Sequence, residues 1–297
     1  MQDSPVYIDP HIHMISRTTD DYENMAAAGI VAVVEPAFWQ GQPRTHVGTF
    51  IDYYDMLVGW ERFRAEQFGI LHFCTMGLNP KESNNKELAD EVMKVIPRYL
   101  NKSSVLAVGE IGFDDMTPNE EFYFQAQLEL AKEHELPALV HTPHRDKVKG
   151  TKRTIDLVKE VGINEELVLI DHLNELTLPL AKETGCWCGH SIYPNTKMSE
   201  DRMVKLLQEY GTEKMVVNSA ADWGKSDPLK VPKTGDAMKV AGFSDQDIRK
   251  VLFENPIEYY AQSGKITIED ITRPNIDQTE LFEENSALRG QTPVVEK

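Results

Sequence analysis

A repeated alternation of short apolar runs with longer stretches of helical spacing constrains this chain more than any other feature. The runs are expected to be strands at 6–8, 30–35, 69–76, 105–111, 136–141, 167–172, 186–192 and 215–218. Between them, helices are expected at 20–28, 51–67, 86–100, 119–135, 151–161, 175–184 and 199–210, several of them ending at a glycine. The runs are continuous rather than alternating, as in parallel strands that are covered on both faces. Eight such units predict a TIM (β/α)8 barrel of the α/β class.

A doubly wound open sheet is the alternative fold, but no G-x-G-x-x-G turn follows the first run. Closing helices are expected at 236–241 and 245–253. We therefore expect a barrel over residues 1–262 and a polar C-terminal extension over 263–297. That extension could wrap the barrel, contact another subunit of a homo-oligomer or be partly disordered. A polar stretch at 40–50 has the length of a lid.

Charge and cysteine content limit the partners and the compartment. The 297 residues carry a formal net charge of −17, which argues against unaided binding of nucleic acid, where affinity comes largely from lysine and arginine. Three cysteines make no disulfide framework. Asp3 and Asp9 interrupt the N-terminal stretch, so neither a signal peptide nor a membrane span is predicted. We expect a cytoplasmic protein with a small-molecule substrate.

Metal-ligating side chains gather at the ends of the predicted strands. They are His11, His13, Glu110, His141, His172 and Asp222, with Asp171 beside His172. His11 and His13 are two residues apart, so both imidazoles face the same way in an extended segment. Because barrel enzymes place their chemistry at the carboxyl ends of the strands, these side chains are expected to meet at one rim.

Imidazole and carboxylate together suit zinc, manganese or iron without choosing among them. Two neighbouring cations need a bridging anion, and Glu110 is placed to bridge two divalent metal ions. A water or hydroxide would be the second bridge, with its pKa lowered toward about 7 on a metal. That metal-bound hydroxide is the expected nucleophile. Asp222 is expected to bind a metal, orient the hydroxide and shuttle its proton, so Asp222 and Glu110 are the predicted catalytic residues.

Over roughly residues 7–262, the chain resembles the TatD-like metal-dependent hydrolases of the amidohydrolase superfamily. The resemblance rests on Asp9-Pro10-His11-Ile12-His13, Gly109-Glu110-Ile111-Gly112-Phe113-Asp114, His141 with Arg145-Asp146 nearby, His172 and Asp222. It implies that His11 and His13 hold one metal together with Asp222. It also implies that His141 and His172 hold the other metal and that Glu110 bridges the two.

The segments that would face a substrate depart from the pattern of TatD-type nucleases. Those enzymes usually carry Glu-Thr-Asp before a proline at the last strand, where this chain has Asn218-Ser219-Ala220-Ala221-Asp222-Trp223-Gly224. Leu173-Asn174-Glu175 follows His172 in place of a Cys-Phe-Ser/Thr-Gly segment, and the fifth run ends in His141-Thr142-Pro143-His144-Arg145 in place of His-x-Arg. The resemblance is therefore to a divergent branch, and these departures weigh against DNA as the substrate.

Four further residues are candidates for substrate binding: Glu35, His144, Arg145 and Trp223. Arg145 could bind a phosphate or carboxylate in bidentate fashion, or form a salt bridge with Asp146 or Glu175. Glu35 could face the metals or only its own loop. Trp223 could cover the site or pack in the core.

The sequence predicts a metal-dependent hydrolase that acts on a small polar or anionic ester, phosphoester or amide. A TatD-type deoxyribonuclease is the enzymatic alternative. A catalytically silent metal-binding barrel in a biosynthetic pathway is the alternative from another class, although all six expected ligands are present.

Overall fold

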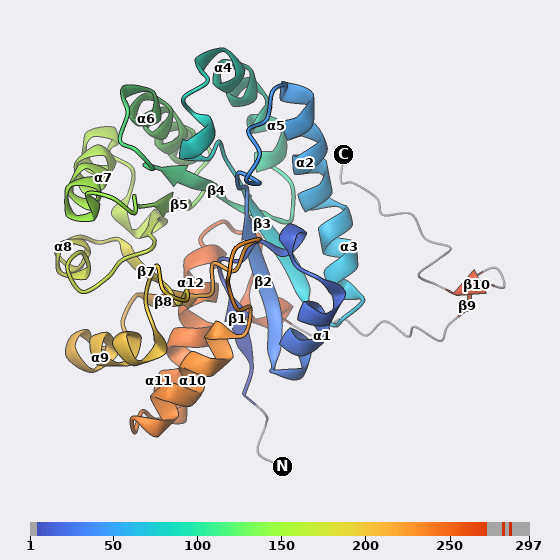
Figure 1. The fold of residues 1–297 in the computed structure, drawn as a ribbon, viewed down its shortest axis with the longest axis vertical. Coiled ribbons are helices and arrows are strands. Elements are labelled where there is room, and N and C mark those ends of the chain that lie inside the picture. The colour runs from blue at the N-terminus through green and yellow to red at the C-terminus, as the bar shows by residue number, and fades with distance from the viewer. Residues whose placement is uncertain (1–4, 272–280, 283–284, 287–297) are drawn as a thin grey trace.

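The structure is a computed structural model that describes residues 5–271, 281–282 and 285–286. Eight parallel strands form one sheet whose order follows the chain. They are β1 (Tyr7–Asp9), β2 (Ile30–Pro36), β3 (Leu71–Met76), β4 (Val105–Gly112), β5 (Ala138–His141), β6 (Val168–Ile170), β7 (Trp187–Ser191) and β8 (Met215–Asn218). The elements follow one another around the barrel in chain order (Figure 1). The predicted TIM (β/α)8 barrel is confirmed.

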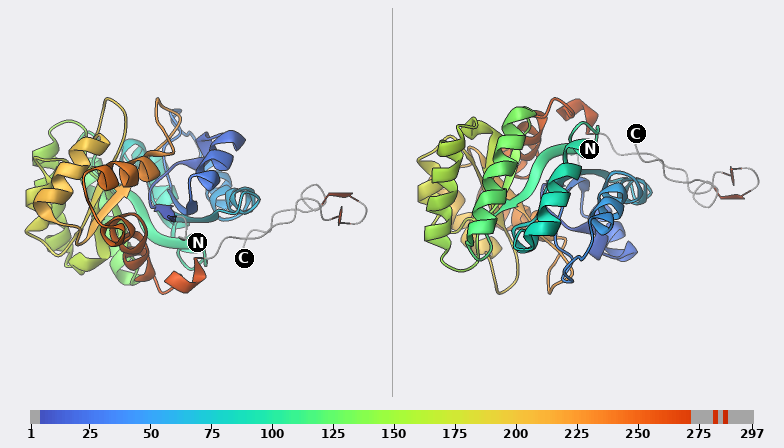
Figure 2. Two further views of the ribbon diagram at one scale, coloured as in Figure 1. Left: turned by 90° about the horizontal axis from the view of Figure 1, so that it is seen from below. Right: turned by 90° about the horizontal axis from the view of Figure 1, so that it is seen from above.

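Helices form the layer outside the strands, as both views in Figure 2 show. The α-helices are α1 (Thr19–Ala27), α2 (Val47–Val58), α3 (Trp60–Glu66), α4 (Lys86–Val95), α5 (Pro97–Leu100), α6 (Pro118–Glu133), α7 (Lys147–Val161), α8 (Leu178–Lys182), α9 (Glu200–Tyr210), α10 (Lys230–Val240), α11 (Asp245–Arg249) and α12 (Asn255–Ala261). Short helical turns lie at η1 (Met14–Ser16), η2 (Pro80–Glu82), η3 (Glu165–Leu167) and η5 (Ile268–Asp270), and the π-helix η4 (Lys250–Glu254) leads into α12. β9 (Leu281–Phe282) and β10 (Asn285–Ser286) pair antiparallel. Across the described residues, no helix combines the length and the apolar character needed to cross a bilayer.

Two expected helices are each divided in the structure. The helix expected at 51–67 is α2 followed by α3, with Gly59 ending the first and capping the second. The helix expected at 86–100 is α4 followed by α5, because Pro97 lacks the backbone N–H that a continuous helix would use. The stretch interpreted as a lid at 40–50 is shorter than expected, since α2 already begins at Val47. The first closing helix, α10, begins at Lys230 rather than at residue 236.

The core has two layers. The larger cluster lies between the strands and the surrounding helices, and a second cluster includes Ile8, Val34, Leu106, Leu139 and Val216 from the strands. Helix α12 covers this second cluster: the Tyr260 hydroxyl donates to the Pro10 carbonyl at 2.9 Å, and the Tyr259 hydroxyl donates to the Ala138 carbonyl at 2.7 Å. Buried hydroxyls need such acceptors, so these bonds fix α12 on the sheet.

The chain remains packed on the barrel beyond residue 262, the boundary expected from the sequence. The Lys265 ammonium donates to the carbonyls of Leu100 and Val105 at 2.5 and 2.6 Å. Ile266 is 5% exposed and belongs to the same cluster as Tyr260. Barrel packing therefore continues at least to this isoleucine.

The seam between β8 and β1 is joined just beyond the strands. Ala220 N donates to the His11 carbonyl, and His13 N donates to the Ala221 carbonyl, both at 2.8 Å. These bonds fix the two N-terminal histidines beside the segment that carries Asp222.

Candidate metal centre

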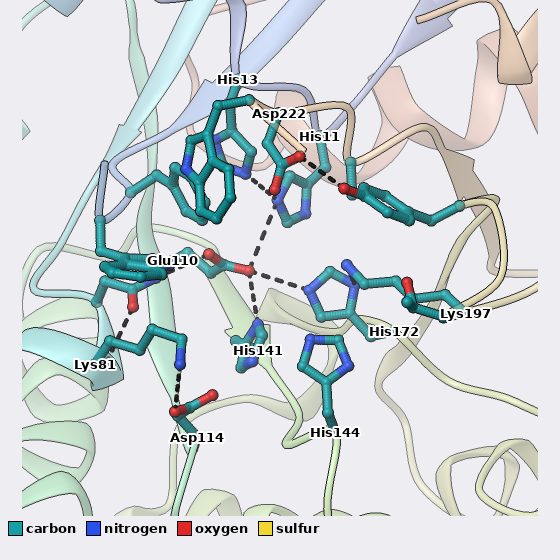
Figure 3. Close-up of a pocket in the computed structure, with 17 residues that line it drawn as sticks. His11, His13, Lys81, Glu110, Asp114, His141, His144, His172, Lys197 and Asp222 are labelled. Atoms are coloured by element: carbon teal, nitrogen blue, oxygen red, sulfur yellow. Dashed lines mark hydrogen bonds and ion pairs between the residues drawn. The ribbon is translucent and has the colours of Figure 1, made fainter. Parts of the chain in front are cut away.

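A pocket of about 490 Å³ opens at the carboxyl ends of the strands. It is lined by all six side chains that the sequence predicts as metal ligands, together with His144 and Trp223 (Figure 3). The other lining residues are Phe38, Trp39, Asn79, Lys81, Asp114, Tyr193, Thr196, Lys197 and Ala220.

Five of the six expected ligands form two compact groups that share Glu110. One group is His11, His13 and Glu110, and the other is Glu110, His141 and His172. Within each group the ligand atoms lie within 4.8 Å of one another, so each group could hold a metal ion. Asp222 lines the same pocket but stands outside both groups.

Glu110 is held at the middle of this arrangement by an irregularity in β4. Gly109 pairs with Leu139 and Ile111 pairs with the next residue, Val140, so Glu110 is the extra residue of a bulge. Its Oε1 lies 2.9 Å from His141 Nδ1, 3.1 Å from His172 Nε2 and 3.7 Å from His11 Nε2. Its Oε2 accepts a hydrogen bond from Asn79 Nδ2 at 3.0 Å.

The tautomer of His11 follows from its contact with Asp171. His11 Nδ1 lies 2.6 Å from Asp171 Oδ2, so this nitrogen carries the proton and donates to the carboxylate. Burial opposes a charge on His11, but Glu110 and Asp171 outweigh it and raise the pKa of this imidazole. His11 Nε2 lies 3.2 Å from His13 Nε2.

The tautomer of His172 is fixed by a chain of hydrogen bonds that begins at the same carboxylate. Asn218 Nδ2 donates to both oxygens of Asp171 at 3.0 Å, which leaves its Oδ1 to accept from the Ser191 hydroxyl at 2.7 Å. Ser191 Oγ lies 2.6 Å from His172 Nδ1, and with the hydroxyl proton already used, the proton between them belongs to the imidazole. His172 Nε2 then carries a lone pair that points toward Glu110 Oε1.

The two groups bring imidazole nitrogens and a buried carboxylate oxygen close together, which is an arrangement that a cation satisfies. Burial and the charge of His11 lower the pKa of His13 well below its ordinary value. Burial and the Lys197 ammonium do the same for His172. Neutral imidazoles and a carboxylate are the form in which these side chains bind divalent metals. The residues present therefore fit a metal centre.

Asp171 contacts the imidazoles from the side opposite Glu110. Its Oδ2 lies 2.6 Å from His11 Nδ1 and 3.6 Å from His172 Nδ1. Burial alone would raise the pKa of Asp171, but the contacts with His172 and His11 outweigh it and hold the pKa below its ordinary value. A Cβ at Gly189 would lie 2.5 Å from Asp171 Oδ1, so only glycine leaves room for this carboxylate. Sequence reasoning placed Asp171 at the rim but gave it no role.

Asp222 is positioned by Tyr193 and by its own turn. Its Oδ1 accepts from the Tyr193 hydroxyl at 2.8 Å and from Gly224 N at 2.7 Å. A Cβ at Gly224 would lie 2.3 Å from the Tyr193 hydroxyl oxygen, so glycine is needed for this approach. Among the described residues no donor reaches Oδ2. Figure 3 shows Asp222 beside His11 and His13.

Two of the four expected substrate contacts lie in the pocket. The ring centroid of His144 is 5.7 Å from that of His141, and burial together with His141 lowers the pKa of His144 to about 3, so this ring is neutral. Trp223 is 53% exposed, and its ring meets that of Trp39 edge to face at the pocket wall.

The other two expected contacts, Glu35 and Arg145, are not among the residues that line this pocket. Glu35 is fully buried, where its Oε1 accepts from Ile15 N and its Oε2 contacts His72 Nε2, both at 2.8 Å. The exposed Arg145 guanidinium donates to Asp115, a partner that sequence reasoning did not consider. The structure thus places neither side chain where we expected it.

Two lysines of the pocket escaped the sequence analysis. Lys81 Nζ donates to Asp114 Oδ2 at 2.8 Å and lies 5.1 Å from the centroid of the Trp39 ring. Lys197 Nζ lies 3.2 Å from His172 Nδ1. Lys81 lies in the short turn η2 and Lys197 in the loop after β7, where no strand or helix periodicity predicts which way a side chain points.

Comparison with known proteins agrees with this geometry. Residues 8–259 match the family described as TatD related DNase. The chain is 28% identical over 254 residues to an uncharacterized metal-dependent hydrolase of Methanocaldococcus jannaschii, an alignment that covers 85% of this chain and 99% of the relative.

Solved structures share the fold. The TatD-like protein of Archaeoglobus fulgidus is 25% identical with a TM-score of 0.71, and the match covers 86% of this chain and 99% of that one. A phosphotriesterase homology protein of Escherichia coli, solved with phosphate in its active site, is 16% identical with a TM-score of 0.60, over 87% of this chain and 99% of that one.

Proposed function

The chain belongs to the TatD related DNase family and is a metal-dependent hydrolase, and from this premise we propose that it cleaves a small polar or anionic ester, phosphoester or amide with the help of two divalent metal ions. The observation that carries the proposal is the convergence of His11 Nε2 and His172 Nε2 on Glu110 Oε1. Buried polar atoms need partners, and a cation held among these three atoms would supply one.

In this proposal His11, His13 and Asp222 would hold one ion, His141 and His172 would hold the other, and Glu110 would serve both. The donor set suits zinc, manganese or iron. When bound, such ions supply a nucleophilic water of lowered pKa and neutralise the charge that develops on the substrate.

The side chains around the ions have separate tasks. Asp222 accepts a proton at Oδ2, since the bonds from Tyr193 and Gly224 hold its Oδ1 in place. Asp171 keeps the proton of His11 on Nδ1 and thereby keeps Nε2 available. His144 and Trp223 line the space in which the substrate binds.

The size of the pocket supports a small substrate. A volume of about 490 Å³ lies in the range of small-molecule sites, which is about 300–1,000 Å³. The net charge of −17 disfavours a long polyanion, which gains its affinity from lysine and arginine.

The test combines metal analysis with turnover. Protein purified without chelator is expected to carry more than one equivalent of divalent metal by mass spectrometry. It is expected to hydrolyse at least one member of a panel of phosphomonoester, phosphodiester, amide and lactone substrates. Asp222→Asn should abolish this turnover, while Asp115→Asn, an exposed carboxylate that pairs with Arg145, should not. Full activity in metal-depleted protein would contradict the proposal.

A second candidate function, a deoxyribonuclease, is favoured by the family match itself. Single-stranded DNA incubated with the protein and Mg²⁺ or Mn²⁺ tests it. Degradation that is lost in Asp222→Asn would support a nuclease, and intact DNA alongside turnover of a small ester would exclude it. Retained metal without turnover of any substrate would point instead to a catalytically silent barrel.

A further inference from the structure

Lys197 brings an ammonium group to the edge of the metal centre from a short loop after β7. The loop is closed by hydrogen bonds from Met198 N to the Ser191 carbonyl at 3.2 Å and from Tyr193 N to the Met198 carbonyl at 3.1 Å. Lys197 Nζ lies 5.4 Å from the centroid of the Tyr193 ring, a cation–π contact within the same loop. Both side chains line the pocket, and Figure 3 shows Lys197 beside His172.

The contact between Lys197 and His172 is not a hydrogen bond that an ammonium can donate. Its Nζ lies 3.2 Å from His172 Nδ1. That nitrogen carries a proton and donates to Ser191 Oγ at 2.6 Å, because the Ser191 proton is used on Asn218. An ammonium is only a donor, so a protonated nitrogen cannot accept from it. Binding of a metal at His172 Nε2 requires the same tautomer.

The other lysine of the pocket is a useful contrast. Lys81 Nζ is neutralised by Asp114 Oδ2 at 2.8 Å. Lys197 forms no ion pair with any carboxylate of the described residues. Burial lowers the pKa of its ammonium, although Glu110, Asp171 and Asp222 attract the charge from farther away. A half-buried ammonium without an acceptor is costly, and the cost is recovered when a ligand brings an oxygen to it.

We propose that Lys197 binds an oxyanion carried by the substrate, a carboxylate or phosphate oxygen that lies next to the bond to be cleaved. The inference deepens the proposed hydrolase function and rests on it for placing the substrate in this pocket. It narrows the substrate class to anionic esters, phosphoesters or amides. Tyr193 holds both the Lys197 ammonium and Asp222, so the loop after β7 couples recognition of this charge to the residue that accepts the proton.

Binding of simple anions tests the proposal without turnover. Inorganic phosphate and acetate are titrated by calorimetry into the metal-loaded wild type, Lys197→Gln, Lys197→Arg and the exposed control Lys239→Gln, with metal content and melting temperature measured for each. Loss of a charge-assisted hydrogen bond should weaken anion binding about 10- to 100-fold in Lys197→Gln. Lys197→Arg, which keeps the charge, should stay within about 3-fold of the wild type. If only phosphate binding weakens in Lys197→Gln, the substrate group is a phosphate. If only acetate binding weakens, the substrate group is a carboxylate.

Equal anion affinity in the wild type and Lys197→Gln, at equal metal content, would overturn the proposal, as would a wild type that binds neither anion. Turnover supplies a second readout on a matched pair of substrates, an ester that carries a free carboxylate and its neutral methyl ester. Lys197→Gln should lower kcat/KM for the charged ester at least about 10-fold more than for the neutral one. A protein that hydrolyses no substrate contradicts the proposed function, whereas the anion titrations still decide the role of Lys197.

Discussion

Asp171 Oδ2 lies 2.6 Å from His11 Nδ1, and this one buried carboxylate positions the imidazole protons of two histidines of the candidate metal centre. It acts on His11 directly. It acts on His172 through Asn218 and Ser191, whose hydrogen bonds leave the imidazole proton on Nδ1. Partners of this kind orient metal-binding histidines and raise their basicity.

Replacing Asp171 with asparagine should weaken metal binding about 10- to 100-fold, because an amide no longer holds the His11 proton on Nδ1. Competition between the protein and a chelating dye measures the affinity. Asp115→Asn is the matched control, since that carboxylate pairs with Arg145 at the surface. An affinity in Asp171→Asn equal to that of the control would show that the tautomer of His11 does not depend on this contact.

Tyr193→Phe should lower kcat about 10-fold and leave KM within about 3-fold, because the variant removes one of two hydrogen bonds to Asp222 Oδ1 while Gly224 N still donates. Steady-state kinetics on an active member of the substrate panel checks this, with Tyr210→Phe on α9 as the control. A raised KM with unchanged kcat would mean that the hydroxyl contacts the substrate rather than holding Asp222.

The sequence was sufficient for the barrel and for the convergence of His11, His13, Glu110, His141 and His172, because both follow from strand order and strand ends. In a parallel barrel the carboxyl ends of all strands meet at one rim, whatever the loops do. Period-two alternation likewise predicted that His11 and His13 face the same way.

The remaining parts of the site depend on contacts that strand order does not determine. The role of Asp171 follows from which imidazole nitrogen its carboxylate meets, a matter of side-chain geometry. Lys197 and Lys81 come from segments without periodic pattern. Arg145 pairs with Asp115, which lies in the loop after the preceding strand β4, 30 residues earlier in the chain. Glu35 ends inside the protein because its side chain packs against His72 of the neighbouring strand β3.

The buried contact between Glu35 and His72 should make stability depend on pH. Burial raises the pKa of Glu35 to about 8 from an ordinary value of 4.5, so the folded state keeps a proton that the unfolded state loses. The stabilisation of the folded state by this proton is complete below pH 4.5 and is lost as the pH rises to 8. Burial lowers the pKa of His72 to about 4, so its contribution is complete above pH 6.5 and is lost as the pH falls. Between pH 6.5 and 8 the loss of stability from Glu35 is therefore the larger effect. Glu61 adds to it up to about pH 7, because burial and Glu35 raise the pKa of Glu61 to about 7.

Glu35→Gln removes this titration while its amide can still donate to His72. Urea unfolding at pH 6.5 and 8.0 should show the wild type losing about 2 kcal/mol more than the variant, from about 1.4 kcal/mol per pH unit. Glu133→Gln, an exposed residue of α6, should behave as the wild type. Parallel losses in the wild type and Glu35→Gln would mean that Glu35 is ionised in the folded protein.

Two truncations should locate the end of the barrel. A chain that ends at residue 271 keeps Ile266 in the core and keeps the Lys265 ammonium on the carbonyls of Leu100 and Val105. A chain that ends at residue 262 loses them, exposing the apolar surface that Ile266 covers and leaving those carbonyls without this donor. Burial of one isoleucine is worth about 1.5–3 kcal/mol and each hydrogen bond about 1 kcal/mol. The free energy of unfolding in urea should therefore be about 3 kcal/mol or more lower for the shorter truncation than for the longer one. Equal stability of the two would place the boundary at residue 262 and reduce the contacts of Lys265 and Ile266 to incidental packing.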